Sequence, residues 1–155
     1  MAEAAIREKA LREAELACAR RGAQLTPLRR QVLELVLDAE APVGAYALLD
    51  RLKASRPGAA PPTVYRALDF LLEHGLIHKV ERLNAYIGCT DAGHGHAHDH
   101  GHPHQFLICR RCGVTVEIAD RAVTHAIAEA AARAGFTGVE ATVEIEGICA
   151  RCAAA

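Results

Sequence analysis

The sequence predicts an α+β protein whose helical first part ends in a β-hairpin and is followed by a smaller α/β part. Three observations predict this class. Apolar residues recur at helical spacing up to residue 75, two short apolar runs follow, and strand-like alternation returns after residue 104. Short helices followed by a hairpin are the order of elements in a winged helix-turn-helix. We therefore expect a winged-helix domain over residues 1–88, a histidine-rich hinge loop over 89–104 and a second domain over 105–155.

The first two helices are predicted from their ends as well as from their periodicity. Charged residues interspersed with Ala and Leu predict a helix over residues 3–21 that ends at Gly22. Thr26 is a suitable N-cap for the second helix, and Pro27 suits its first turn because an N–H there would have no helical partner. The buried face of this second helix is predicted to comprise Leu28, Val32, Leu35 and Val36.

Two further helices complete the first part. The third is expected over residues 43–55, with Tyr46, Leu49 and Leu52 on one face. A turn rich in Pro and Gly follows, and Pro62 and Thr63 then begin the fourth helix, which ends at Gly75. Its buried stripe is predicted to comprise Val64, Leu68, Leu71 and Leu72.

Short strands make up most of the remaining chain. The runs "LIHKV" and "NAYIGC", joined by Glu81-Arg82-Leu83, predict the hairpin. After the histidine-rich loop, "QFLIC" and "VTVEI" predict strands, "DRAVTHAIAEAAARAG" predicts a helix, and the strict alternation of "VEATVEIEG" predicts a half-buried strand. This second part is small for a core of its own, so we expect it to need a metal, a partner subunit or both.

The composition indicates a cytoplasmic protein with a hydrophobic core and no membrane partner. Hydrophobic residues make up 51% of the 155 residues, yet no apolar run approaches the roughly 20 residues that span a bilayer. The N-terminus has no apolar signal-peptide region. Because the cytoplasm disfavours disulfides, the six cysteines are expected to be metal ligands or free thiols.

Four of the cysteines form two Cys-x-x-Cys knuckles, Cys109 with Cys112 and Cys149 with Cys152. Four thiolates from two such knuckles can enclose one tetrahedral Zn²⁺, which predicts a closed site that stabilises structure and does not catalyse. The alternative is a redox pair or free thiols. Cys18 lies within an apolar helix pattern and is expected to be a packed thiol. Nothing in the sequence matches a Ser-His-Asp or Cys-His catalytic set, so we expect neither an enzyme nor a small-molecule substrate.

The fourth helix offers a face that suits a DNA major groove. Arg66 can pair with a guanine edge, and Tyr65 can contact phosphate or base. The alternative is an ordinary solvated helix face, and the excess of 13 Lys/Arg over 11 Asp/Glu in residues 1–88 is too small to decide. The predicted DNA contacts are Tyr46, Thr63, Tyr65 and Arg66, with possible phosphate contacts from Arg29, Arg30 and Lys79.

Several stretches together carry a family resemblance. "LTPLRRQVLELVL", "PPTVYRALDFLLEHGLIHKVE", "FLICRRCG" and the terminal "CARC" resemble, in the same order, the Fur family of metal-responsive repressors. "PVGAYALLDRLK" and "LDFLLEHGLIHKVERLNAYIGC" look like its zinc-uptake-regulator branch. The resemblance implies an N-terminal winged helix, a C-terminal α/β dimerisation domain, and binding of a homodimer to a palindromic operator under the control of a metal.

The resemblance also implies a second, regulatory zinc site. Its ligands would be His78, Cys89, Glu117 and one histidine before the first knuckle, either His102 or His104. A ligand set that mixes imidazole, thiolate and carboxylate suits Zn²⁺ better than iron or manganese. We therefore expect two zinc ions per chain and a zinc-dependent repressor of zinc-uptake genes.

Three alternatives remain open. The fold could serve a sensor of another metal (iron, manganese or nickel) or of peroxide. The histidine-rich loop could be the working part of a zinc-storage or zinc-delivery protein; we instead expect its histidines 94, 96, 98 and 100 to be solvated, or to bind extra metal weakly. Asp50 and Lys53 of the third helix are candidates for contacts between neighbouring dimers on DNA.

Overall fold

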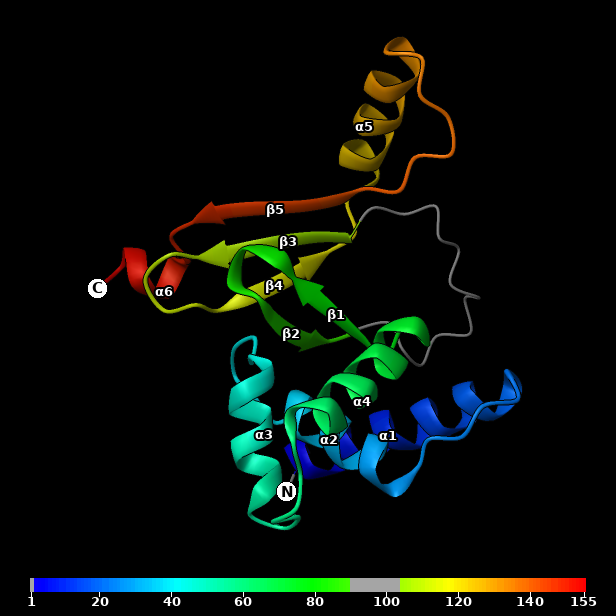
Figure 1. Cartoon of the computed structure of the whole chain (residues 1–155). Coiled ribbons are helices and arrows are strands. Elements are labelled where there is room, and N and C mark those ends of the chain that lie inside the picture. The colour runs from blue at the N-terminus through cyan, green and yellow to red at the C-terminus, as the bar shows by residue number, and fades with distance from the viewer. Residues whose placement is uncertain (1, 90–103) are drawn as a thin grey trace. The chain divides into compact units, whose positions relative to one another are not determined.

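The computed structural model describes residues 2–89 and 104–155, and the chain divides into two compact units, Met1–Gly95 and His96–Ala155 (Figure 1). The first unit contains α1 (Ala2–Arg20), α2 (Pro27–Leu37), α3 (Ala45–Lys53), α4 (Pro61–Glu73), β1 (Ile77–Val80), η1 (Glu81–Leu83) and β2 (Ala85–Gly88). The second contains β3 (His104–Cys109), β4 (Thr115–Ile118), α5 (Arg121–Arg133), β5 (Thr142–Gly147) and α6 (Ala150–Ala153). Across the described residues, every helix is too short or too polar to cross a membrane.

The core of the first unit joins all four helices to the hairpin. The predicted cap of α2 is present, since the backbone N–H of Arg29 donates to Thr26 Oγ1 at 3.4 Å and Pro27 occupies the first turn. Cys18 is buried between α1 and the rest of this core, as predicted. The helices pack mainly through residues that are fully buried, among them Leu11, Val32, Leu48, Leu52, Val64, Leu68 and Leu71.

One side chain of α3 lies elsewhere than predicted. Tyr46 does not share the buried face with Leu49 and Leu52, because 68% of its surface is exposed. The buried face of α3 is completed by Ala45 and Leu48 instead, which follow the same helical spacing and turn Tyr46 to the side. The tyrosine is therefore available to a partner.

The hairpin is tightly built against the helices. β1 and β2 pair antiparallel, from Ile77 opposite Gly88 to Val80 opposite Ala85. Asn84 closes the connection with φ of +45°, a left-handed conformation that asparagine tolerates better than most residues. A Cβ atom on Gly88 would lie 2.5 Å from Leu37 Cδ2, so a larger residue at the end of β2 would have to displace the Leu37 side chain.

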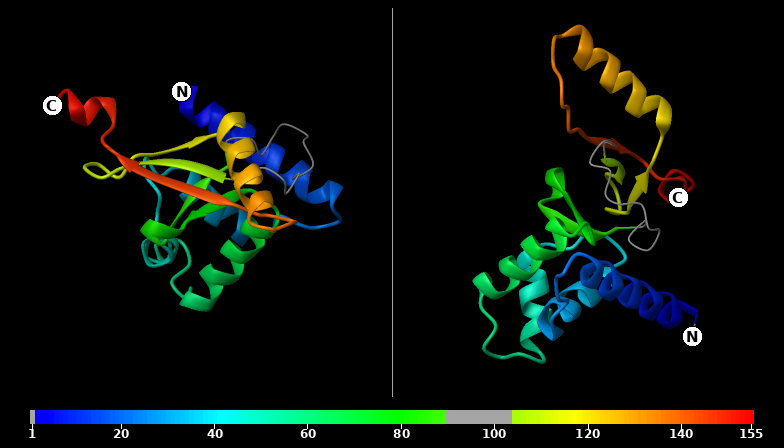
Figure 2. Two further views of the ribbon diagram at one scale, coloured as in Figure 1. Left: turned by 90° about the horizontal axis from the view of Figure 1, so that it is seen from above. Right: turned by 90° about the vertical axis from the view of Figure 1, so that its right-hand side faces the viewer.

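The second unit is a three-stranded sheet in the order β4-β3-β5. β3 pairs antiparallel with β4 and parallel with β5, and α5 lies in the connection between β4 and β5. Phe106 and Ile108 of the central strand are buried. By contrast α5, which is described over its full length, buries none of its side chains and stands away from the strands (Figures 1 and 2).

The last strand departs in part from the prediction. β5 begins at Thr142, so Val139 and Ala141 of the predicted strand precede it, and Ile145 is 44% exposed. Ile145 is therefore only partly covered by the described residues of this chain. The short helix α6, which begins directly after Cys149 and contains Cys152, was not predicted.

Candidate metal centre and nucleic-acid interface

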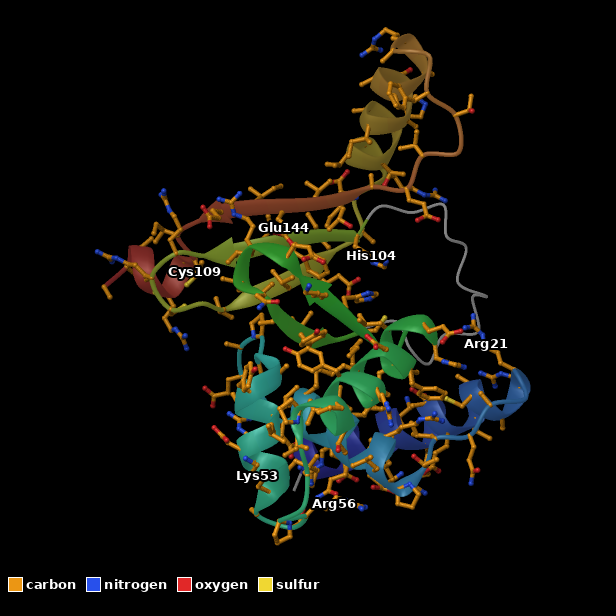
Figure 3. All side chains as sticks on the ribbon, viewed as in Figure 1. Arg21, Lys53, Arg56, His104, Cys109 and Glu144 are labelled. Atoms are coloured by element: carbon orange, nitrogen blue, oxygen red, sulfur yellow. The ribbon has the colours of Figure 1, made fainter. Side chains whose placement is uncertain are left out.

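The four knuckle cysteines converge at one end of the second unit. Cys109 is the last residue of β3 (Figure 3), and Cys112 lies in the turn that follows, whereas Cys149 is the N-cap of α6 and Cys152 lies within that helix. Their sulfur atoms all lie within 4.8 Å of one another, and the Sγ atoms of Cys112 and Cys149 are 3.8 Å apart. A tetrahedron with metal–sulfur bonds of about 2.3 Å has edges of about 3.8 Å. The spacing therefore fits a four-thiolate zinc site, and all six cysteines of the chain are free of disulfides.

Hydrogen bonds give these thiols different acidities. The backbone N–H of Cys149 donates to Cys109 Sγ at 3.4 Å and, together with the backbone N–H of Cys112, lowers the pKa of Cys109 to about 6. Hydrogen bonds with Cys149 and then Cys112 raise the pKa of Cys152 to about 12. Four thiolates this close repel one another, and a divalent cation among them would favour deprotonation of all four.

A second pair of candidate ligands lies on the hairpin of the first unit. His78 is in β1, opposite Ile87, and Cys89 directly follows β2. The backbone N–H of Cys89 donates to the carbonyl of Leu76 at 3.1 Å, which extends the pairing of the hairpin by one residue. The hairpin thereby holds an imidazole nitrogen and a thiol within 4.8 Å of each other.

The second unit holds two more candidate ligands. His104 begins β3 (Figure 3), and Glu117 lies in the neighbouring strand β4, opposite Phe106. His104 Nδ1 and Glu117 Oε1 are 3.6 Å apart. The other predicted histidine ligand, His102, lies outside the described residues, as do histidines 94, 96, 98 and 100 of the loop.

The predicted face of α4 is open to a partner. Arg66 and Asp69 are exposed, and Tyr65 is 40% exposed. Thr63 also has a local role, because the backbone N–H of Ala60 donates to its hydroxyl at 3.4 Å and so secures the start of α4. α4 thus presents an aromatic and a guanidinium side chain on its outer face.

Three side chains were predicted to contact DNA phosphates, and each of them makes contacts within the first unit. They are Arg29, Arg30 and Lys79. Arg29 stacks on the ring of Phe70, with its guanidinium carbon 3.7 Å from the ring centroid. Arg30 forms ion pairs with carboxylates of α1 and α2, and Lys79 pairs with Glu81 at 3.1 Å. These contacts give the three residues structural roles within the first unit.

Two residues at the thiol cluster, Arg111 and Arg151, were not predicted from the sequence. Both occupy intervening positions of the Cys-x-x-Cys knuckles, and each makes a contact to the opposite knuckle. Both residues could have been identified from the sequence, because each is a basic residue between two cysteines that carry negative charge as metal ligands.

Comparison with known proteins shows which proteins this chain is similar to. A sequence model of the ferric uptake regulator family matches residues 20–146. The zinc uptake regulation protein of Escherichia coli (strain K12) is 41% identical over 145 residues, which cover 94% of this chain and 82% of that protein. A solved zinc uptake regulator in complex with zinc and DNA is 40% identical, covers 96% of this chain and 95% of its own, and has a TM-score of 0.87. The holo form of the protein XcZur is 46% identical, covers 94% of this chain and 97% of its own, and has a TM-score of 0.81. These matches confirm the predicted order of a winged helix followed by a small α/β domain.

Proposed function

Because the chain belongs to the ferric uptake regulator family and resembles zinc uptake regulators over nearly its whole length, we propose that it is a zinc-responsive, sequence-specific DNA-binding repressor of zinc-uptake genes. Zinc at a regulatory site raises its affinity for operator DNA. One relative is a zinc uptake regulation protein, and another was solved with zinc and DNA. We infer zinc and DNA as ligands of this chain from its similarity to these two proteins.

The observation that carries the choice of zinc is the pair of ligands on the hairpin. His78 and Cys89 offer a nitrogen and a sulfur within 4.8 Å. Thiolate with imidazole suits Zn²⁺, whereas manganese and magnesium prefer oxygen ligands. A wing that ends in this pair is suited to a sensor of zinc.

We assign the regulatory site to ligands from both units. His78 and Cys89 come from the first unit, and Glu117 with either His102 or His104 comes from the second. A metal bound by ligands of both units restricts the positions that α4 can take relative to the second unit. Zinc can act as a signal only if it binds the DNA-competent arrangement more tightly, and operator DNA must then tighten zinc binding by the same factor.

A separate zinc ion belongs to the four-cysteine site, which makes two ions per chain. The site closes a loop between the end of β3 and α6 and leaves no position for a substrate, so its role is structural. This assignment is supported by the sulfur spacing and by the small number of buried side chains in the second unit. Metal binding and folding of that unit are therefore expected to be coupled.

The second unit also offers a surface for a second copy of the chain. Val116, Leu107 and Ile145 are register neighbours across β4, β3 and β5, and they are 50%, 40% and 44% exposed. An apolar row of this kind in a unit with little core of its own is typical of an obligate interface. A homodimer would carry two α4 helices and would match a palindromic operator.

On the DNA side, α4 is assigned as the recognition helix. Tyr65 and Arg66 lie on its outer face, Thr63 lies at its start, and Tyr46 of α3 is exposed. Arg66 is the residue best suited to read a base, because a guanidinium can form two hydrogen bonds with guanine.

A metal-by-metal binding assay tests this function. A labelled promoter fragment of a zinc-uptake gene should shift on addition of the zinc-loaded dimer, and EDTA should reverse the shift. Fe²⁺, Mn²⁺ and Ni²⁺ should support weaker binding at equal free concentration, and a random duplex of equal length is the control. Zinc-independent binding, or equal affinity for both duplexes, would contradict the proposal. A zinc-storage protein would bind neither duplex.

A further inference from the structure

The thiol cluster is flanked by arginines that lie inside the knuckles themselves. The first knuckle is Cys109-Arg110-Arg111-Cys112, and the second is Cys149-Ala150-Arg151-Cys152. The unit that carries them is otherwise poor in basic residues, because only five of the 18 Lys and Arg residues of the chain lie beyond residue 88. Three of those five therefore lie between zinc-ligand candidates.

Two of these arginines reach across to the opposite knuckle. Arg111 Nη1 donates to the backbone carbonyl of Cys152 at 2.6 Å, which joins positions 41 residues apart. Arg151 interacts in the reverse direction, since its guanidinium lies close enough to the thiol of Cys112 for the thiol to raise its pKa. Its guanidinium also lies close enough to Cys149 and Cys152 for their charges to act on it. Each knuckle thus holds the other through one arginine.

We propose that Arg111 and Arg151 form a reciprocal clasp that positions the two knuckles and retains the structural zinc ion. The proposal rests on the four-cysteine zinc site assigned above. The two arginines act differently. Arg111 fixes the backbone of the second knuckle, so it keeps Cys152 in reach of the metal. Arg151 places a positive charge beside thiolates that, with zinc, carry a net charge of −2, and it donates to one of them.

Arg110 supplies a matched control. It lies in the same knuckle, and its backbone N–H donates to the carbonyl of Gly147 at 2.9 Å. Its side chain is exposed, and within the described chain it makes no hydrogen bond or ion pair to either knuckle. Replacing Arg110 with alanine therefore removes one positive charge near the site and leaves both cross-knuckle contacts in place.

Zinc release from the full-length dimer tests the clasp. The parent protein carries Cys89→Ser, so that the structural ion is the one followed, and a metallochromic chelator in excess reports its release. Outer-shell partners typically change metal affinity by roughly 10- to 100-fold. Arg111→Ala and Arg151→Ala should therefore release zinc roughly tenfold faster than the parent, and Arg110→Ala should release it at the parent's rate.

A spectroscopic measurement separates the two roles. In the Co²⁺-substituted parent, a hydrogen bond to a thiolate lowers the energy of the sulfur lone pair and moves the sulfur-to-cobalt charge-transfer band to higher energy. Arg151→Ala should move this band to lower energy, whereas Arg111→Ala and Arg110→Ala should leave it in place. Arg151→Lys should release zinc more slowly than Arg151→Ala, because it keeps the charge.

Two results would overturn the clasp and can be told apart. If the parent binds zinc and all three alanine variants release it at one rate, the clasp is wrong and the four-cysteine site stands. If the parent holds no zinc, the structural site itself is wrong and the clasp falls with it.

Discussion

Arg66 is exposed on the outer face of α4, and within the described residues it makes no hydrogen bond or ion pair. Arg66→Ala should weaken operator binding by about 1–3 kcal/mol and relax specificity at the base pair it contacts. Arg133→Ala, at an exposed position on α5, is the control. Anisotropy titrations with an operator, with single-base variants of it and with random DNA measure the effect. An equal loss of affinity for all duplexes would show that Arg66 contacts only phosphate.

Cys18 should make the stability of the first unit depend on pH. Burial raises the pKa of its thiol above the ordinary 9.0, and Arg29 and Arg21 oppose that shift only in part. The unfolded chain therefore loses this proton at a lower pH than the folded chain. The contribution of Cys18 to stability is complete below pH 9.0 and is lost as the pH rises through the raised folded-state pKa.

Urea titrations of wild type and Cys18→Ala can measure this dependence. From about pH 8 to about pH 10, the unfolding free energy of the wild type should fall more than that of Cys18→Ala. The comparison concerns the change with pH, because the alanine variant also loses packing at every pH. Parallel pH profiles for the two proteins would refute the assignment.

Between elements, an ion network fastens α1 to α2. Arg30 of α2 pairs with Glu8 at 3.0 Å and Glu15 at 2.6 Å from α1, and with Glu34 at 3.2 Å in its own helix. Arg30→Ala should lower the unfolding free energy by up to about 1 kcal/mol, less at high salt. Lys9→Ala is the control, because the partner of Lys9 is Glu13 within α1. Equal effects of the two variants in denaturant titrations would show that the network adds nothing between the helices.

The elements that the sequence predicted are those with local signals. Thr26 and Pro27 mark the start of α2, and the apolar stripe of α4 is periodic enough to identify its buried face. The faces of α3 and β5 were harder to predict. In α3, helical spacing alone is compatible with Tyr46 on the buried face as well as with Ala45 and Leu48. In β5, the alternation of apolar and polar residues does not indicate whether another chain covers Ile145. The buried face of α3 and the exposure of β5 depend on packing against other elements. The sequence pattern does not contain this information.

The same distinction holds for the sites. The spacing of the knuckles predicted the convergence of four cysteines, because two Cys-x-x-Cys turns together supply the four ligands of a tetrahedral metal site. His78 and Cys89 are 11 residues apart, and only the register of the hairpin makes them neighbours. The parallel pairing of β3 with β5, which sets the position of the second knuckle, depends on contacts across about 40 residues and has no local signal.

For the whole molecule, assembly should depend on the four-cysteine site. Cys109→Ser removes one of four ligands from a unit that buries few side chains, so the unit should unfold and the chain should no longer dimerise. Cys89→Ser, which leaves the four-cysteine site intact, is the control and should remain dimeric. Sedimentation velocity with parallel zinc analysis measures both properties. A cooperative, dimeric Cys109→Ser protein would contradict the structural role of this zinc.

We propose that zinc controls DNA binding through His78 and Cys89 and not through the histidine-rich loop. A four-ligand site loses most of its geometry when one ligand is removed. In a tract of many histidines, by contrast, one member can replace another. Two variants therefore separate the two locations: Cys89→Ser, and a loop variant in which histidines 94, 96, 98 and 100 are replaced by asparagine.

The most direct test is a zinc titration of both variants, followed by the anisotropy of labelled operator DNA. The loop variant should bind operator with nearly the zinc dependence of the wild type and should lose only weak, excess zinc. Cys89→Ser should stay dimeric, keep one zinc ion per chain and fail to respond to added zinc. If the loop variant loses the response and Cys89→Ser keeps it, the sensor is the histidine-rich loop and the assignment of the regulatory site is wrong.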